Sequence, residues 1–127
     1  MSLKRLAIIG AVAVALAVGA SAYAIYVYDP CETVVHRSIP SPDGSKMIVV
    51  FEAQCGATVG FNTQASLASA SSAFSRRKNP SFFSMNGRHD LVVEWKDDKT
   101  VIMSVPPGDK IYRKDARADD VSVDYRE

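Results

Sequence analysis

The feature that most constrains this chain is a long run without charge near its N-terminus. Residues Leu6 to Tyr28 read LAIIGAVAVALAVGASAYAIYVY, with Lys4 and Arg5 before them and Asp29 after them. An α-helix rises about 1.5 Å per residue, so about 20 apolar residues cross the hydrocarbon core of a bilayer. We therefore predict that residues 6–28 form a transmembrane helix and contact lipid.

The charges beside this run predict its orientation. Lys and Arg collect on the cytoplasmic side of a membrane-spanning helix. We expect residues 1–5 to be a short cytoplasmic segment and residues 29–127 to form one domain on the outer side of the inner membrane. The alternative is a cleaved signal peptide, because small residues two positions apart favour cleavage near Ala22 or Ala24. Cleavage would leave the same domain periplasmic or secreted.

A stripe of small residues lies within the predicted helix. Ala11, Ala15 and Gly19 recur at every fourth position, and such stripes let transmembrane helices approach each other closely. These residues are a candidate helix-packing surface. A segment rich in alanine also produces the pattern without any partner.

The remainder of the chain has the composition of one globular domain. With 127 residues and a formal net charge of +1, the chain has no excess of positive charge for binding nucleic acid. Apolar and polar residues alternate with period two along several segments, and no helical pattern follows Tyr28. These segments are Phe61–Leu67, Asp90–Lys96, Val101–Val105 and Val121–Arg126. We predict an all-β domain, an antiparallel meander curled into a small sandwich or a partly open barrel.

One strand and two turns are predicted most clearly. KMIVVFEAQ, from Lys46 to Gln54, has apolar residues on both faces and is typical of a central strand that is covered on both sides. SPDG at residues 41–44 and Asn86-Gly87 are turn signals, and the second predicts a two-residue hairpin to the strand that follows. We expect Glu52 and Glu94 to be paired groups on the surface.

The two cysteines, Cys31 and Cys55, are predicted to form a disulfide. An exported domain meets an oxidising compartment, and an even count there favours pairing. A nucleophilic Cys55 is disfavoured, because an oxidised sulfur cannot attack. A zinc site would require both cysteines together with His36 and His89, and the five-residue spacing from Cys31 to His36 places them on opposite faces of a strand.

Two irregular segments are candidate binding regions. CGATVGFNT contains Gly56 and Gly60, which permit unusual backbone conformations, and polar groups on Thr58, Asn62 and Thr63 suited to a peptide or glycan. The alternative is a tight bend that carries the chain past the disulfide. ASASSAFSRRKNP ends in a basic group, Arg76, Arg77 and Lys78, which is a candidate contact for anionic lipid or a polyanion, or else a solvated loop.

A set of motifs in the exported part resembles a family of small uncharacterised bacterial envelope proteins. The motifs are the early Cys31, SPDG at 41–44, VVFEAQCGATVGFNTQASL at 49–67, VVEWKDDKTVIMSV at 92–105 and VSVDY at 121–125. Val59 stands where the family usually has a second threonine, and Ala53-Gln54 stands where Arg-Asp is common. The resemblance implies an envelope location and a β fold but no activity.

These features favour a binding role over catalysis. The sequence has no readable spacing of a nucleophile, a His and a carboxylate, so we expect no catalytic residues, no metal site and no cofactor. The favoured hypothesis is a membrane-anchored, extracytoplasmic interaction module with an envelope-protein or cell-wall partner. The alternatives are an accessory subunit that acts through its transmembrane helix, and a secreted hydrolase.

Overall fold

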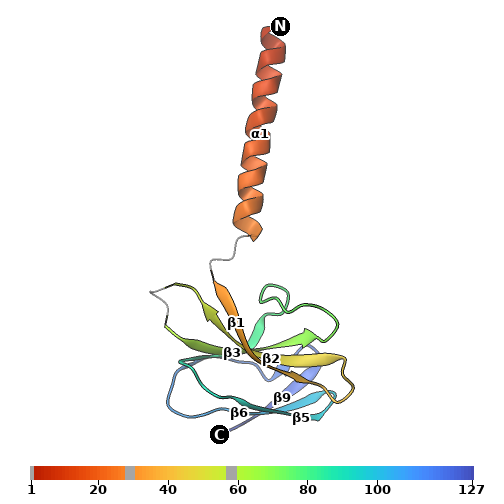
Figure 1. The fold of residues 1–127 in the computed structure, drawn as a ribbon, viewed down its shortest axis with the longest axis vertical. Coiled ribbons are helices and arrows are strands. Elements are labelled where there is room, and N and C mark those ends of the chain that lie inside the picture. Colours follow the sequence, from red (N-terminus) through yellow and green to blue (C-terminus); the bar gives the residue numbers. More distant parts are fainter. Residues whose placement is uncertain (1, 28–30, 57–59) are drawn as a thin grey trace. The chain divides into compact units, whose positions relative to one another are not determined.

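The computed structural model describes residues 2–27, 31–56 and 60–127 in two compact units, Met1–Pro30 and Cys31–Glu127 (Figure 1). The first unit is one apolar helix, α1, from Leu3 to Val27. It begins three residues before the predicted start, so Lys4 and Arg5 lie within its first turn. Its described side chains are all exposed, and the span Leu3–Ile25 is long and apolar enough to cross a membrane. No described residue lies within 4 Å of a Cβ placed on Gly19.

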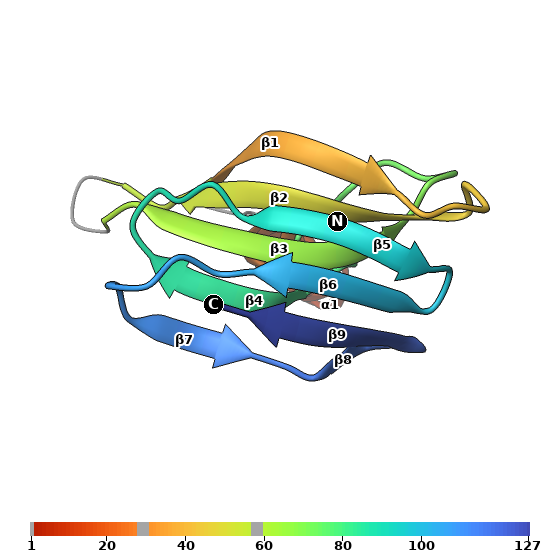
Figure 2. The ribbon, with the colours of Figure 1, turned by 90° about the horizontal axis from the view of Figure 1, so that it is seen from below.

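The second unit is a β sandwich of two sheets, as the alternation of the sequence predicted (Figure 2). The first sheet has the order β1-β2-β3-β4-β7, and all its pairs are antiparallel. Its strands are β1 (Glu32–Pro40), β2 (Lys46–Gln54), β3 (Asn62–Ser69), β4 (Ser81–Asn86) and β7 (Ile111–Lys114). The second sheet has the order β5-β6-β9-β8, with β5 (Val92–Asp97), β6 (Thr100–Ser104), β8 (Arg117–Ala118) and β9 (Val121–Arg126).

The sheets share an apolar interior built from the alternating residues. The predicted inward residues of the second sheet, Val101, Met103, Val121 and Val123, are buried, and Val93, Trp95 and Tyr125 pack beside them. They meet residues of the first sheet that include Ile48, Val50, Ala65, Phe83 and Met85. Two pairings depart from a meander, because β7 pairs with β4 and β9 pairs with β6. The β6–β9 pair is parallel. Parallel strands need a crossover connection, and the chain makes one by leaving the second sheet after β6, forming β7 in the first sheet, and then returning.

The outer face of β2 is covered as well, which confirms the prediction for this strand. Phe74, in the segment between β3 and β4, lies 5.0 Å from Phe51 between ring centroids. The same segment is tied to β1, where Arg76 Nε donates to Thr33 Oγ1 at 2.9 Å. The segment expected as a possible solvated loop therefore closes a second, smaller core with Val49 and Ala68.

The predicted hairpin at Asn86-Gly87 is wrong. Strand β4 pairs with β3 and β7, and the chain after Gly87 crosses to the other sheet, where β5 pairs with β6. Tertiary hydrogen bonds direct this crossover: Gly87 N donates to Phe61 O at 2.8 Å, and His89 N donates to Thr63 Oγ1 at 2.9 Å. Position 87 still favours glycine, since its φ is +81°, a backbone conformation that other residues rarely adopt.

The turns and loops of the sandwich gather at its two ends (Figure 2), and the two ends carry different residues. At the disulfide end, where β1 begins and β2 ends, Cys31 is bonded to Cys55 as predicted. At the opposite end, called here the aspartate end, three turns meet, and Asp43 N donates to Asp98 Oδ1 at 2.9 Å. The aspartates of these turns are Asp43, Asp97, Asp98, Asp119 and Asp120.

The SPDG turn is held by its own aspartate. Asp43 Oδ1 accepts hydrogen bonds from Ser45 N at 3.0 Å, Ser41 Oγ at 2.7 Å and Ser45 Oγ at 2.8 Å. These bonds, led by the one from the Ser45 backbone, lower the pKa of Asp43 from 3.8 to about 2. Each bond favours the ionised carboxylate.

Asp43 is expected to make stability depend on pH in acid. Its pKa is lower in the folded state than in the unfolded state, so its contribution is fully present above pH 3.8 and is lost as the pH falls towards 2. In urea unfolding assays run at pH 5 and at pH 2, the free energy of unfolding of the wild-type protein should therefore fall between the two pH values. The fall should be smaller in the Asp43→Asn variant, which has no carboxylate at this position. Identical pH profiles for the two proteins would contradict this.

Reduction of the disulfide should destabilise the domain strongly. The bond joins residues 24 positions apart, and closing a loop of that size lowers the entropy of the unfolded chain by an amount equivalent to about 3 kcal/mol. Urea unfolding of the full chain in detergent, followed by Trp95 fluorescence with and without reductant, measures this loss. A Cys31→Ser/Cys55→Ser variant is the control, and its midpoint should not respond to reductant.

Candidate functional site

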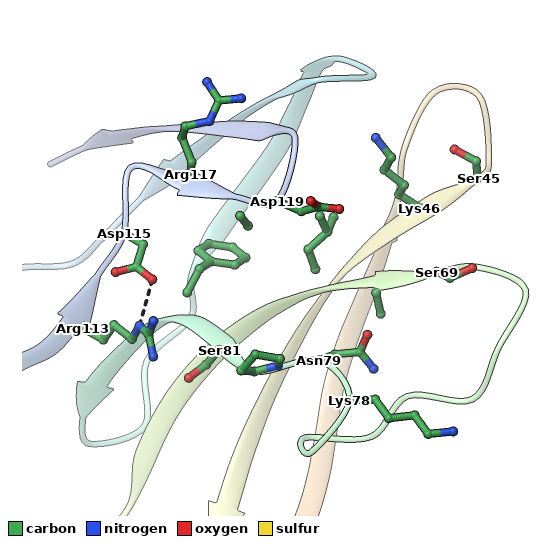
Figure 3. Close-up of a pocket in the computed structure, with 15 residues that line it drawn as sticks. Ser45, Lys46, Ser69, Lys78, Asn79, Ser81, Arg113, Asp115, Arg117 and Asp119 are labelled. Atoms are coloured by element: carbon green, nitrogen blue, oxygen red, sulfur yellow. Dashed lines mark hydrogen bonds and ion pairs between the residues drawn. The ribbon is translucent and has the colours of Figure 1, made fainter.

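A cleft of roughly 660 Å³ opens at the aspartate end of the sandwich (Figure 3). Its residues come from the start of β2, the end of β3, the segment leading into β4, and the chain from β7 to the β8–β9 turn. These pieces meet because β2 and β4 begin where β3 ends, and β8 follows directly after β7. The apolar part of the lining consists of Leu67, Ala68, Pro80, Phe82 and Ala118.

The charged part of the lining is mainly basic. Four cationic residues, Lys46, Lys78, Arg113 and Arg117, face two aspartates, Asp115 and Asp119. Lys46 Nζ lies 3.0 Å from both carboxylate oxygens of Asp120, and this contact is the main cause of the lowered pKa of Asp120. Arg113 Nε lies 2.8 Å from Asp115 Oδ2.

Lys78 and Arg117 differ from the other two cationic residues. Within the part of the chain that the structure describes, neither has an ion pair or a side-chain hydrogen bond. Figure 3 shows them on different walls of the cleft, Lys78 in the segment before β4 and Arg117 on β8. Two positive charges without an ion pair among the described residues, one on each wall of a cleft whose lining is partly apolar, suit a ligand that has both anionic and apolar groups.

The wall at Asp115 is anchored from inside the sandwich. Tyr125 Oη donates to the Asp115 backbone oxygen at 2.6 Å, and Lys114 Nζ lies 5.0 Å from the Tyr125 ring centroid. Burial, with a smaller effect from the Asp115 charge, raises the pKa of Tyr125 to about 12. The phenol therefore stays neutral and keeps its hydrogen bond at any physiological pH.

The predicted basic group is divided by the fold. Lys78 lines the cleft, whereas Arg76 lies against Thr33 on the outer face of the first sheet, and Arg77 is exposed outside the lining. Of the three residues in the predicted basic group, only Lys78 lines the cleft. The other cationic residues of the lining are far from Lys78 in sequence, and no local pattern connects them with it.

The described residues of the predicted binding loop lie at the disulfide end, away from the cleft. Asn62 pairs with the Ala53 backbone through two hydrogen bonds, with Ala53 N as donor to Oδ1 at 3.0 Å and Nδ2 as donor to Ala53 O at 2.7 Å. Thr63 is buried, donates to Gly87 O at 2.7 Å and accepts from His89 N. Their polar groups thus hold the bend together.

The glycines of this loop differ from each other. Both are exposed, but Gly56 has a φ of +107°, which only glycine adopts readily, whereas Gly60 has no such positive φ. Thr58 lies outside the described residues. The structure therefore supports the role of Gly56 in the bend past the disulfide.

Sequence reasoning misplaced Glu52, which is 1% exposed rather than on the surface. Its Oε2 lies 3.2 Å from Arg88 Nε and 3.5 Å from His36 Nε2, and its Oε1 has no hydrogen-bond partner among the described residues. The signal for burial was present, because Glu52 continues the inward series of Ile48 and Val50. Its partners were not visible, since Arg88 lies in the crossover that was predicted to be a hairpin.

The two histidines have separate carboxylate partners. His36 faces Glu52, and His89 Nε2 lies 2.7 Å from Asp109 Oδ2. Both line a second cavity of roughly 350 Å³ at the disulfide end. Among the described residues, no three His, Cys, Asp or Glu side chains come together in a way that could hold a metal ion.

No protein-family model matches the chain, and no curated protein or solved structure matches it either. The fold and the side chains at the cleft are thus the observations from which a function is inferred.

Loss of the Arg88 charge should destabilise the domain by leaving a buried carboxylate with one partner. We expect Arg88→Met, which keeps the packing of the stem, to lower the free energy of unfolding by about 2 kcal/mol. Adding Glu52→Gln should restore most of this loss, because a neutral amide needs no counterion. Arg117→Met is the matched control, and it should change stability by less than about 0.5 kcal/mol. Equal unfolding midpoints for all variants would show that Glu52 does not depend on Arg88.

Proposed function

We propose that this protein is a membrane-anchored binding module of the bacterial envelope. Residues 6–28 hold it in the inner membrane with the N-terminus in the cytoplasm, and the β domain works on the outer side. The apolar helix, the basic residues Lys4 and Arg5 before it, and the disulfide support this arrangement.

The cleft at the aspartate end is the proposed binding site, and the observation that carries the proposal is the pair Lys78 and Arg117. Each is a cation with no partner of its own among the described residues, and between them lies an apolar floor. A ligand carboxylate at either wall would gain a charge-assisted contact without displacing an existing ion pair. Apolar side chains next to that carboxylate would gain burial on Leu67 and Pro80, the more exposed apolar residues of the lining.

These features favour an acidic segment of an envelope protein as the partner. A peptide supplies carboxylates and apolar side chains at close spacing, whereas most glycans offer hydroxyl groups and little apolar surface. An acidic cell-wall polymer would satisfy the cations but would leave the apolar floor uncovered. The salt dependence of binding separates the two, since binding by charge alone weakens much more steeply as ionic strength rises.

A second candidate function is that of an accessory subunit acting through α1. The stripe of small residues Ala11, Ala15 and Gly19 along α1 favours it. Replacing residues 6–28 with an unrelated transmembrane helix should spare activity if the cleft binds the partner. The same replacement should abolish activity if the stripe does.

Charge reversal in the cleft tests the proposal. We expect Lys78→Glu/Arg117→Glu to reduce site-specific crosslinking from a photoreactive residue at Ser69, in native membranes, by about tenfold or more, equivalent to about 1.4 kcal/mol. Lys96→Glu/Lys99→Glu, which makes the same change in net charge outside the cleft lining, should leave the adduct unchanged. Equal loss in both variants would indicate a general charge effect and would contradict a specific site.

The anchored state has its own test. The intact mass of the protein purified from membranes should include residues 1–28. A mass that begins after Ala22 or Ala24 would overturn retention in the membrane and leave the cleft on a soluble domain.

A further inference from the structure

The exposed apolar side chains of the β domain gather in the half that carries the disulfide. Across the described residues of this domain, the large hydrophobic side chains with high exposure are Val35, Phe61, Val92, Ile111 and Tyr112. Phe61 directly precedes β3, Val92 begins β5, and Ile111 begins β7, so all three lie at the disulfide end of their strands (Figure 2). The opposite end has the five aspartates and the cleft. The domain is therefore polarised along its strands.

Two of these side chains are aromatic, and each has a cation close to its ring. The Arg88 guanidinium lies 3.7 Å from the Phe61 ring centroid, and Lys110 Nζ lies 5.5 Å from the Tyr112 ring centroid. Phe61 and Tyr112 are 55% and 59% exposed. Aromatic rings beside basic groups are typical of protein surfaces at the lipid headgroup level, where the ring enters the apolar boundary and the cation meets phosphate.

The backbone under Phe61 is held in place before any partner arrives. Gly87 N donates to Phe61 O at 2.8 Å, and Arg88, over the ring, is itself bonded to the buried Glu52. Because these contacts already hold Phe61 and Arg88, binding to a surface would cost these two residues little conformational entropy.

The sequence leaves a short link between α1 and the β domain. Only residues 28–30 separate Val27, the last residue of α1, from Cys31. At about 3.6 Å per residue, such a link reaches no more than roughly 15 Å even when fully extended. If α1 spans a bilayer, the headgroup layer is the nearest large surface available to residues that neighbour Cys31 and Cys55.

We propose that the disulfide end of the β domain rests on the headgroup layer of the bilayer that α1 crosses, with Phe61 and Tyr112 in the interface and Arg88 and Lys110 against lipid phosphates. This inference depends on the proposed anchoring. It extends that proposal by assigning a second lipid contact, outside the helix, and by directing the cleft away from the membrane into the aqueous compartment.

Fluorescence quenching by brominated lipid tests this contact in the full chain. The protein would be reconstituted into phosphatidylethanolamine and phosphatidylglycerol vesicles, with bromine near the headgroup end of the acyl chains. Trp95 is the single tryptophan, so Trp95→Phe/Phe61→Trp reports from the disulfide end. Trp95→Phe/Lys99→Trp reports from the aspartate end as the matched control.

We expect the tryptophan at position 61 to lose emission in brominated vesicles relative to unbrominated ones, and the tryptophan at position 99 to keep it. Unchanged emission at position 61 would overturn the proposal, as would equal quenching at both positions. Emission at position 61 that responds only to the protein-to-lipid ratio would also overturn it, because a second copy would then cover this end. If Trp95→Phe fails to fold, the same substitutions on the native Trp95 background, after subtraction of the wild-type signal, give the same comparison.

Failure of the anchoring and failure of the lipid contact give different results. Flotation of the vesicles, with carbonate extraction, reports whether α1 is inserted. Protein that floats and resists extraction but shows no quenching at position 61 contradicts the lipid contact alone. Protein that does not float contradicts the anchored state itself.

Discussion

Every other feature of the β domain depends on the apolar layer between its two sheets. Residues such as Ile48, Phe83 and Met103 are fully buried there, and a domain of this size has no second interior large enough to stabilise it. Two side-chain hydrogen bonds close the layer along one edge: Arg37 donates to the Leu91 backbone oxygen, and Trp95 Nε1 donates to Ile39 O at 2.9 Å. The strand ends, and with them the cleft and both groups of turns, are positioned by this packing.

Glu52 is the exception within that layer, and it connects the layer to the surface. A buried carboxylate is costly unless it is paired, and its partner Arg88 comes from the crossover that leads from one sheet to the other. The guanidinium then lies over Phe61, beside the loop that follows the disulfide. A charge in the interior thus helps to set the position of an exposed aromatic ring.

The polarity of the sandwich brings the proposals together. Exposed aromatic and aliphatic side chains gather at the disulfide end, while the cleft and the five aspartates of the three turns lie at the other. A sandwich suits this division, because all its turns fall at two ends and each end can have its own composition. In the proposed arrangement one end contacts lipid and the other offers Lys78 and Arg117 to a partner, with the strands as a rigid spacer between them.

The sequence by itself determined the features that depend on local pattern. The uncharged run specified the N-terminal helix, the apolar run specified β2, and alternation specified β3, β5, β6 and β9 with inward residues such as Val101 and Met103. Two cysteines left one possible pairing. No such pattern predicted β1, β7 or β8. Tertiary structure decided everything that depends on which segments meet. It turned Asn86-Gly87 into a crossover, paired β9 with β6 in parallel, and brought Lys78 and Arg117 to one cleft. The physical reason is that periodicity reports which face of a strand is buried, whereas the neighbour of each strand is selected by packing between residues far apart in the chain.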